Sequence, residues 1–580
     1  MMRARHDRRW EREALGWVGG ALLGAVLGCA PAPPRFPARP PLWEDPDQMP
    51  YGPAPEEYVS PMAWDVADQS IFYPLTRVFA VDPAGEALNV NALDEVPNSS
   101  WFTNRIGLKP MSPADVALGP CAAGSSDPPT PWKVTGAKPN GANPGFIIKD
   151  AAGERHLVKF DGVVQGPRAT AADVIVSKLY HAAGFSVPCN RVVFFAPADV
   201  SIAEGASSED AKGDKEPLTQ AHIDAVFAKS QRLPDGRLRA STSLFLPGKP
   251  IGPFTYQGTL DEDPNDVVPH QDRRELRASR LLAAWTQHFD AREQNTLSTW
   301  IETGENQGYV RHNLLDFGDC FGSVWEPPSL GRRLGHSYYF DISYTLEDWL
   351  TLGVIERPWD TARFGPTGKV LGYYGLESFE PERWKAGYPN PAFGRMSERD
   401  GAWMARIIAQ LGDDQLRELI SIAHLDEPVV RAELFRVLAG RRERILTRYL
   451  TRLSSLTLPT TGRSKARELC LRDMVQASGI RKAHRRTYAA TLYSSVNAPG
   501  LALPQVREAE GDRVCVDLPP MLGAASQAPK YFVVDWVGQS ESFAAEFPAR
   551  VHLADLGAAG LLVVGLERPE SFDPPVYRAQ

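Results

Sequence analysis

Apolar and polar residues alternate in several short stretches between residues 131 and 255, a pattern that predicts strands with one buried face. Three such stretches, separated by a glycine-bearing loop and by the turn AAGE, end with HLVKF at residues 156–160. An alanine-rich segment at 169–185 has helical spacing, and two more strand patterns follow it. Residues 199–217 are polar, so we expect a mobile insertion there. This order predicts a small antiparallel sheet lobe with one packed helix over residues 131–255.

Longer apolar repeats at helical spacing dominate the next part of the chain. The segment RRELRASRLLAAWTQH at 273–288 predicts a helix, and the apolar stretches TLSTWI and YVRHNLLDF after it predict a hairpin. Residues 319–400 are rich in aromatic residues, proline and glycine, whereas residues 398–456 have a clear helical pattern. We therefore expect a helical lobe over residues 256–490. Short strand patterns resume towards the C-terminus and predict a β-rich region over 497–580.

The whole chain is thus predicted to be an α+β protein with a two-lobed body, and residues 60–130 are expected to form an irregular wrap around it. A chain of 580 residues is long enough for several cores, and 43% hydrophobic with 23% charged residues is ordinary for a globular protein. The formal net charge is −8 and no basic run stands out. The composition therefore argues against a nucleic-acid partner.

The N-terminus has the layout of an export signal. An arginine-rich start precedes the apolar stretch LGWVGGALLGAVLG, which is short for a membrane span, and Cys29 follows directly. This resembles a bacterial lipobox, which implies removal of residues 1–28 and lipidation of the Cys29 thiol. Ten prolines within residues 31–55 predict an extended tether over residues 29–59. We expect a protein of the bacterial cell envelope, periplasmic or surface-exposed, that contacts the membrane through its lipid; the alternative is an uncleaved signal anchor with a chance cysteine.

The remaining cysteines are widely spaced and form no CxxC pair, which argues against a metal cluster or a redox motif. In an oxidising compartment they allow one or two disulfides, and the sequence leaves their pairing open. They are Cys121, Cys189, Cys320, Cys470 and Cys515.

The segment HFDAREQN at residues 288–295 follows the predicted helix, and a hairpin later the chain reads Asp316-Phe317-Gly318. This combination resembles the protein-kinase motifs H-R-D-x-x-x-x-N and D-F-G. Phosphoryl transfer needs an aspartate that accepts the proton of the attacking hydroxyl, and oxygen ligands that hold Mg²⁺ against the phosphates. The resemblance implies that Asp290 is the base and that Asn295 and Asp316 are the ligands of Mg²⁺ or Mn²⁺.

Further residues fit the same resemblance. Lys159 lies on the third strand of the sheet lobe, where a kinase keeps the lysine that contacts ATP phosphates; the alternative is a surface lysine on an edge strand. Its helix partner would be Asp173 in place of the usual glutamate. Three glycines between the first two strands could let the backbone approach phosphates, although their spacing is not G-x-G-x-x-G. They are Gly136, Gly141 and Gly145.

The departures from the kinase motifs identify a divergent relative. Phe289 replaces the arginine of H-R-D, no APE motif follows, and Arg292 occupies the place of a phosphate-neutralising lysine. These features resemble the branch that includes HipA-type, CotH-type and phosphatidylinositol kinases. The tract from WFTNRIG through PNDVVPH to HNLLDFG also resembles a family of bacterial lipoproteins without an assigned activity.

The sequence thus predicts an exported, atypical kinase that binds ATP and transfers a phosphoryl group to a hydroxyl acceptor of unknown identity. Two alternatives remain at this stage. One is a pseudokinase-like module that binds a nucleotide, glycan or partner without turnover. The other is a structural envelope lipoprotein in which the motif residues only cap loops.

Overall fold

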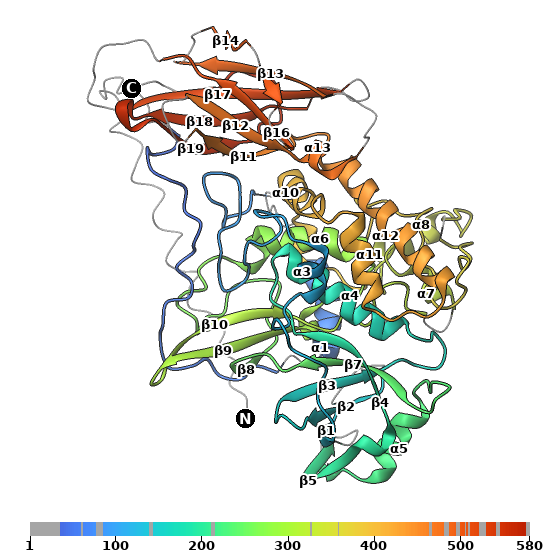
Figure 1. Ribbon diagram of the computed structural model, residues 1–580. Coiled ribbons are helices and arrows are strands. Elements are labelled where there is room, and N and C mark those ends of the chain that lie inside the picture. The colour runs from blue at the N-terminus through green and yellow to red at the C-terminus, as the bar shows by residue number, and fades with distance from the viewer. Residues whose placement is uncertain are drawn as a thin grey trace.

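The structure is a computed structural model (Figure 1). It describes residues 35–59, 62–76, 85–138, 143–209, 215–324, 328–357, 359–462, 467–480, 486–494, 499–504, 506–508, 511–520, 529–540 and 546–575. Within these residues, no helix is both long enough and apolar enough to cross a membrane. Lipidation at Cys29 and the signal peptide 1–28 lie outside the described residues, as does Gly141.

A seven-stranded sheet forms the N-terminal part of the fold, with strand order β4-β7-β3-β2-β1-β5-β6. Helix α4 (Arg168–Ala183) packs on it, and α5 (Gln220–Ala228) covers part of a second apolar layer built around Phe146, Phe160 and Phe227. The strands are β1 (Trp132–Ala137), β2 (Gly145–Lys149), β3 (Arg155–Phe160), β4 (Asn190–Phe195), β5 (Val200–Glu209), β6 (Lys215–Pro217) and β7 (Leu238–Leu244).

Two details of this sheet differ from the prediction. The described residues 199–209 and 215–217 do not form a mobile insertion, because β5 and β6 lie there and extend the sheet edge. Their polar composition fits the edge of the sheet, where all three residues of β6 are exposed and β5 is partly exposed. The sheet is also not wholly antiparallel, since β5 pairs with β1 in parallel after the chain crosses over from β4.

Helices form the middle of the molecule, between the sheet and the C-terminal strands (Figure 1). The long helices pack on one another and on α4 in a single apolar core that includes Trp285, Phe317 and Trp403. These helices are α6 (Arg274–Thr286), α10 (Glu398–Ile408), α11 (Asp413–Ser421) and α12 (Pro428–Tyr449). A small sheet of β8 (Lys249–Gly252), β9 (Thr296–Gly304) and β10 (Gln307–Leu314) lies beside α6, and its β9–β10 hairpin is the predicted one.

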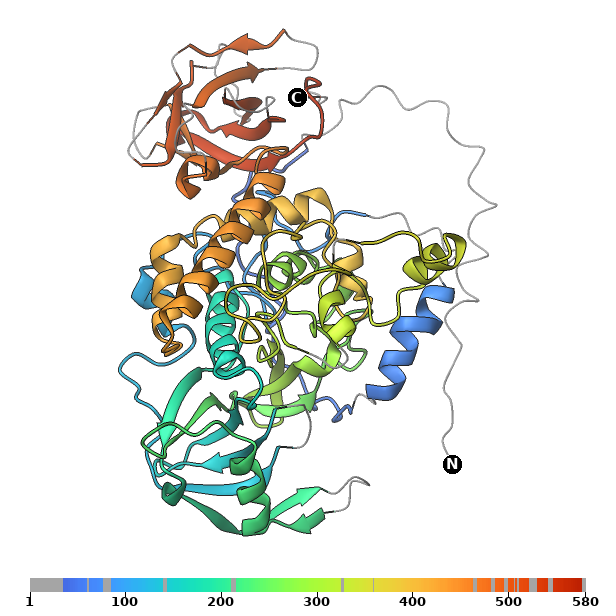
Figure 2. The ribbon, with the colours of Figure 1, turned by 90° about the vertical axis from the view of Figure 1, so that its right-hand side faces the viewer.

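Shorter helices complete this part of the chain. They are α1 (Met62–Ala67) with the π-helical turn Asp68–Phe72 and α2 (Tyr73–Thr76), α3 (Pro113–Leu118), α7 (Pro328–Arg333), α8 (Ile342–Leu350) and α9 (Pro391–Gly394). Figure 2 shows the helical segment 62–76 on the outside of the helical body.

The C-terminal region packs two antiparallel sheets around a separate apolar core that contains Trp536. One sheet has the order β11-β12-β16-β15 and the other β14-β13-β17-β18-β19. The strands are β11 (Leu456–Thr461), β12 (Glu468–Asp473), β13 (Arg486–Tyr493), β14 (Leu501–Ala502), β15 (Arg507–Glu508), β16 (Arg513–Asp517), β17 (Lys530–Ser540), β18 (Ala549–Asp555) and β19 (Leu561–Glu567), with α13 (Met474–Ser478) after β12. Strands therefore begin at Leu456, earlier than expected, because β11 and β12 are short and too mixed in polarity to show a strand pattern.

Buried ion pairs join the C-terminal region to the helices. Asp94, in the loop after the helical segment 62–76, accepts hydrogen bonds from Arg568 at 3.1 Å and from Arg274 of α6 at 2.6 Å. Arg274 in turn bonds Asp400 of α10 at 3.1 Å. Because all four side chains are buried or nearly so, the two parts share one continuous charged network.

The described part of the predicted tether does not hold the body at a distance. Phe36 lies against His552 and over Gly565, where a Cβ atom would be 2.3 Å from its ring. Further along, Asp47 accepts hydrogen bonds from Ser100. Aromatic and acidic side chains between the prolines therefore anchor residues 35–59 to the fold.

Candidate functional site

Lys159 links three elements of the fold. It points from β3 with 5% of its surface exposed, and its ammonium lies 3.3 Å from Asp173 Oδ1 on α4 and 3.0 Å from Asp316 Oδ1 after β10. A buried lysine is costly unless anions surround it, and here two carboxylates do so. The shorter side chain of Asp173 reaches because α4 packs directly on the sheet, where Ser241 of β7 also donates to its Oδ2 at 3.1 Å.

The Asp316-Phe317-Gly318 segment is fixed by both backbone and packing. Asp316 has a φ of 52°, a left-handed conformation that few residues other than glycine adopt. The next amide, that of Phe317, donates to Asp173 Oδ1 at 3.3 Å, and the Phe317 ring is fully buried. It lies 4.9 Å from the ring of Tyr180 and 5.3 Å from that of His288. The apolar anchor of Phe317 thus holds the Asp316 carboxylate toward Lys159.

The loop after α6 brings the other predicted residues to the same place. The Asn295 amide nitrogen donates to the Asp290 backbone oxygen at 2.8 Å and to Asp290 Oδ2 at 2.9 Å. This use of the nitrogen leaves the amide oxygen as the atom of Asn295 for a metal. Arg292 lies 3.1 Å from Asp290 Oδ1, and the Leu315 amide donates to the Asn295 backbone oxygen at 2.9 Å. That last bond ties the loop to the residue before Asp316.

His288 serves the loop as a buried, neutral packing residue. Burial lowers its pKa to about 4, and its Nδ1 lies 3.4 Å from the Tyr180 hydroxyl. Phe289 is also buried, and its backbone oxygen accepts from the Gly387 amide at 2.6 Å. The side chains before Asp290 therefore orient the loop from within the core and do not take part in charge exchange.

The carboxylates of the site differ in their electrostatics. Burial alone would raise the pKa of Asp316, but Lys159 and Lys138 hold it well below its usual range. Burial likewise would lower the pKa of Lys159, but Asp173 and Asp316 raise it. Burial raises the pKa of Asp290 to about 7, although Arg292 opposes this shift. Asp290 is thus poised near neutral pH, as a proton acceptor requires, while Asp316 stays anionic.

Asp319 and Lys138 also belong to the site, although the sequence motifs did not identify them. Burial and the nearby Asp316 raise the pKa of Asp319. Lys138 follows β1 and donates to the Asn143 backbone oxygen at 3.3 Å, and its charge acts on both Asp316 and Asp319. Two features of the sequence could have identified them: Asp319 directly follows Asp316-Phe317-Gly318, and Lys138 directly follows the first strand.

The donor set suits a magnesium or manganese ion. Hard divalent cations prefer carboxylate and amide oxygens, and Asp316, Asn295 and Asp319 offer these. Burial first and repulsion from the anionic Asp316 second raise the pKa of Asp319, and a bound cation would relieve the repulsion. The residues present therefore fit such an ion.

The expectation that Gly136 and Gly145 lie in the loop between the first two strands is wrong, because Gly136 belongs to β1 and Gly145 is the first residue of β2. A Cβ atom on Gly145 would lie 2.4 Å from the Val158 backbone oxygen of β3, and one on Gly136 would lie 3.4 Å from the Ser207 oxygen of β5. Close strand packing thus accounts for Gly145, and a register shift of β1 falls beside Gly136.

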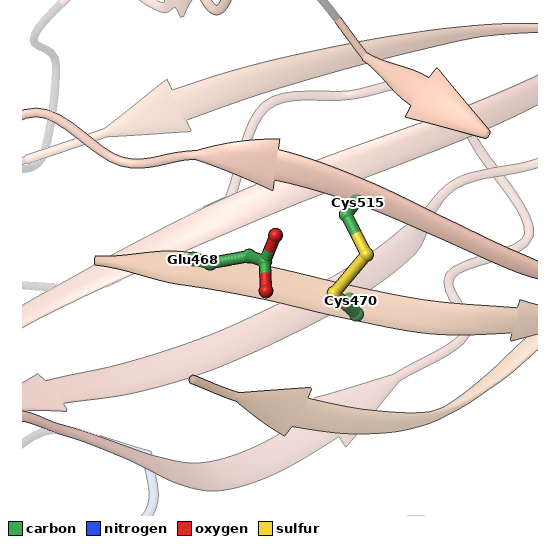
Figure 3. Close-up of side chains that lie close together, drawn as sticks. All are labelled: Glu468, Cys470 and Cys515. Atoms are coloured by element: carbon green, nitrogen blue, oxygen red, sulfur yellow. A yellow bond between two sulfur atoms is a disulfide. The ribbon is translucent and has the colours of Figure 1, made fainter. Parts of the chain in front are cut away.

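A second group of potential metal ligands lies in the C-terminal region but holds no free thiolate. Glu468, Cys470 and Cys515 have ligand atoms within 4.8 Å of one another, and Figure 3 shows the two cysteines joined in a disulfide across β12 and β16. A second disulfide joins Cys121 to Cys189, and Cys320 is free and buried. These pairings leave the site around Lys159 as the stronger candidate.

Comparisons with known proteins add little to this geometry. No protein-family model matches the sequence, and no curated protein matches it. Two crystal structures of a Golgi casein kinase are similar to the chain, one of them with Mn and ADP bound; they have 10% and 9% sequence identity and TM-scores of 0.24 and 0.25. Each match covers 55% of this chain and 75% of the other. Because so low a TM-score does not define a shared fold, the functional argument rests on the site itself.

Proposed function

We propose that the protein is an atypical kinase that transfers the γ-phosphoryl group of ATP to a hydroxyl group. The observation that carries the proposal is the position of Lys159, which lies between Asp173 and Asp316, next to a loop that presents Asp290 and Asn295. A structural loop does not need a base, an amide ligand and a poised carboxylate beside a buried cation. Phosphotransfer uses all of them.

Each residue has a role that follows from its surroundings. Lys159, with Lys138 nearby, neutralises phosphate oxygens, and Asp173 keeps Lys159 in place. Asp290 accepts the proton of the acceptor hydroxyl, and Arg292 stabilises the Asp290 carboxylate. Asp316, Asn295 and Asp319 would hold Mg²⁺ or Mn²⁺, which when bound neutralises the charge of the phosphates.

A thermal-shift measurement tests the proposal. The melting temperature of the protein should rise with ATP and Mg²⁺ together but not with ATP alone, since ligand binding to the native state adds stability. Asp316→Ala should abolish the rise. If millimolar ATP and Mg²⁺ produce no shift in the wild-type protein, neither the kinase nor a nucleotide-binding function stands.

We also propose that the protein acts in the cell envelope as a lipoprotein anchored through Cys29. Two disulfides, Cys121–Cys189 and Cys470–Cys515, support export because such bonds persist in oxidising compartments. Cys29→Ala should move the protein from the membrane fraction to the soluble fraction and abolish incorporation of a labelled fatty acid. Incorporation that survives this substitution would refute the anchor.

A further inference from the structure

Helix α8 and the loop that follows it present apolar side chains to solvent. Leu346, Trp349 and Leu350 recur at helical spacing, so they share one face of α8, and each is more than half exposed. The apolar surface continues beyond the helix. Its most exposed members are 80% to 90% exposed: Trp349, Leu350, Leu352 and Val354. Single exposed apolar side chains are ordinary, but a contiguous group of them marks an interaction surface.

Ion pairs fix this orientation of α8. Arg357 lies 2.5 Å from Glu347 and 2.8 Å from Asp348, both on the side of α8 opposite its apolar face. Asp341, which caps the start of α8, pairs with Lys385 at 2.6 Å. Turning the apolar face inward would break these contacts, so the fold holds that face outward.

The helical segment 62–76 carries a second exposed apolar surface. Four of its large apolar side chains are 40% to 61% exposed: Trp64, Ile71, Phe72 and Leu75. The rings of Trp64 and Phe72 stack with centroids 5.5 Å apart, which shows that they share a face. Figure 2 shows this segment, in blue, and α8, in olive, at the same edge of the molecule. The two surfaces can therefore contact one large partner together.

The predicted lipid anchor at Cys29 makes a bilayer the partner within reach. Arg35 lies 2.5 Å from Glu567, and Phe36 packs over Gly565, so the chain is fixed to the fold six positions after Cys29. Six residues span at most about 20 Å, so a lipid on Cys29 would hold the bilayer close to the folded body. Since a single acyl chain binds a membrane only weakly, a second contact adds to the attachment.

The chemistry of the two surfaces suits the interface of a neutral bilayer. Tryptophan and leucine side chains gain free energy there, and the indole ring prefers the level of the headgroups. Residues 342–357 include three acidic side chains and one basic side chain, so their net charge is −2. Residues 62–76 include two acidic side chains and no lysine or arginine. Attraction to anionic lipids thus plays no part, and burial of apolar area would drive the contact.

We propose that α8, residues 351–355 and the helical segment 62–76 dock together on a lipid bilayer. The choice of a bilayer rests on the proposed lipid anchor. Gln294, in the loop that bears Asp290, donates to Asp65 of the docked segment at 3.2 Å. Docking would therefore hold that loop beside the membrane surface, an orientation that the lipid at Cys29 alone does not fix.

Co-flotation with vesicles of neutral phosphatidylcholine tests the inference. The mature chain, residues 29–580 with Cys29→Ala, carries no lipid, so only the protein surface contributes. Half of it should float at about 1 mM lipid, and vesicles with added phosphatidylglycerol should bind it no better. Trp349→Ser combined with Leu350→Ser removes apolar area that the fold does not bury, and should weaken binding at least about tenfold. A contact this weak is lost when membranes are washed, so fractionation still reports the lipid at Cys29.

Leu88→Ser combined with Val267→Ser is the matched control. These side chains are 63% and 76% exposed but belong to neither segment, so this variant should bind vesicles as the parent chain does. No flotation at about 10 mM lipid, or equal flotation of the two double variants, would overturn the inference.

Further results separate the surface from the anchor. If Cys29 acquires a labelled fatty acid in cells but the unlipidated chain does not float, the anchor stands and the docking surface fails. If the chain floats but Cys29 acquires no fatty acid, the anchor fails and the docking surface stands. Self-association that Trp349→Ser with Leu350→Ser abolishes, without any flotation, would assign the surface to a second copy of the chain instead.

Discussion

Two clusters of charged side chains in this protein differ in how completely their charges are paired. In the C-terminal region, Arg486 lies 2.5 Å from Asp473 and 2.7 Å from Glu546, and Tyr488 and Ser455 bond the same carboxylates. All three guanidinium nitrogens of Arg486 and all four oxygens of Asp473 and Glu546 have hydrogen-bond partners, and these three residues are buried. Such a cluster needs no ligand and serves the architecture.

The cluster around Lys159 is not closed in this way. The Asp316 side chain is 34% exposed, and burial first and nearby carboxylates second raise the pKa of Asp290 and of Asp319. Like charges at partial exposure are what a bound cation and phosphates would balance. Both clusters contain buried charges, so burial of charge alone does not indicate a functional site. Carboxylates that lack enough cations and are partly exposed to solvent do.

The largest effect is expected from Asp316→Asn. Loss of this carboxylate removes a metal ligand and one of the two anions beside Lys159, so the rate of phosphotransfer from ATP should fall about 10³-fold or more. Initial rates with labelled ATP measure it. Asp535→Asn, which breaks the buried pair with Arg550 in the C-terminal region, should leave the rate unchanged. An equal fall in the phosphotransfer rate of the two variants would show that the cluster around Lys159 has no special role in the reaction.

Asp290→Asn should lower the rate of transfer by about 10²- to 10⁴-fold, because the loop then has no proton acceptor. Nucleotide binding should persist, since Asp290 does not contact Lys159. Parallel measurements of the rate and of the ATP-dependent thermal shift separate the two effects. Transfer at the wild-type rate in this variant would remove the base assignment.

Arg486→Met tests the closed cluster. Removing the cation leaves Asp473 and Glu546 buried without their partner, and the free energy of unfolding should fall by about 3–5 kcal/mol. Denaturant titration measures this loss, and the ATP-dependent thermal shift should remain. A variant of full stability would show that the cluster is not architectural.

A smaller effect is expected from acid. Burial alone would raise the pKa of Asp94, but Arg274, Arg568 and Arg406 hold it below its ordinary value of 3.8. A lowered pKa adds stability that is complete above 3.8 and is lost as the pH falls below it. Stability should therefore decline below about pH 4, and Arg568→Met should make the decline shallower. Identical acid profiles for the two proteins would exclude Asp94 as its source.

The sequence predicts those site residues whose positions depend only on neighbouring residues in the chain. The segment HFDAREQN and Asp316 are each set by a helix end or a strand end, and Lys159 by a strand with a clear alternating pattern, so their positions could be predicted. Asp173 was uncertain because a distance between α4 and the sheet, not a spacing in sequence, decides whether it reaches Lys159. Lys138 was not identified from the sequence at all, because its approach to Asp316 also depends on how distant elements pack.

Features built from distant contacts were beyond such reasoning. The disulfide Cys470–Cys515 depends on the register of β12 and β16. The strands β5 and β6 gain their structure from pairing with the sheet. Residues 35–59 gain theirs from contacts with residues far along the chain, among them Ser100, Gly308 and Gly565. Tertiary pairing overrides local composition in each case.

Hydrogen exchange with and without ATP and Mg²⁺ tests the central contrast most directly. Binding at the open cluster should slow exchange in residues 132–160 and 288–318, while residues 456–494, around the closed cluster, should exchange at an unchanged rate. Slower exchange in 456–494 alone, or no change in any of these segments at millimolar nucleotide, would contradict the proposed site.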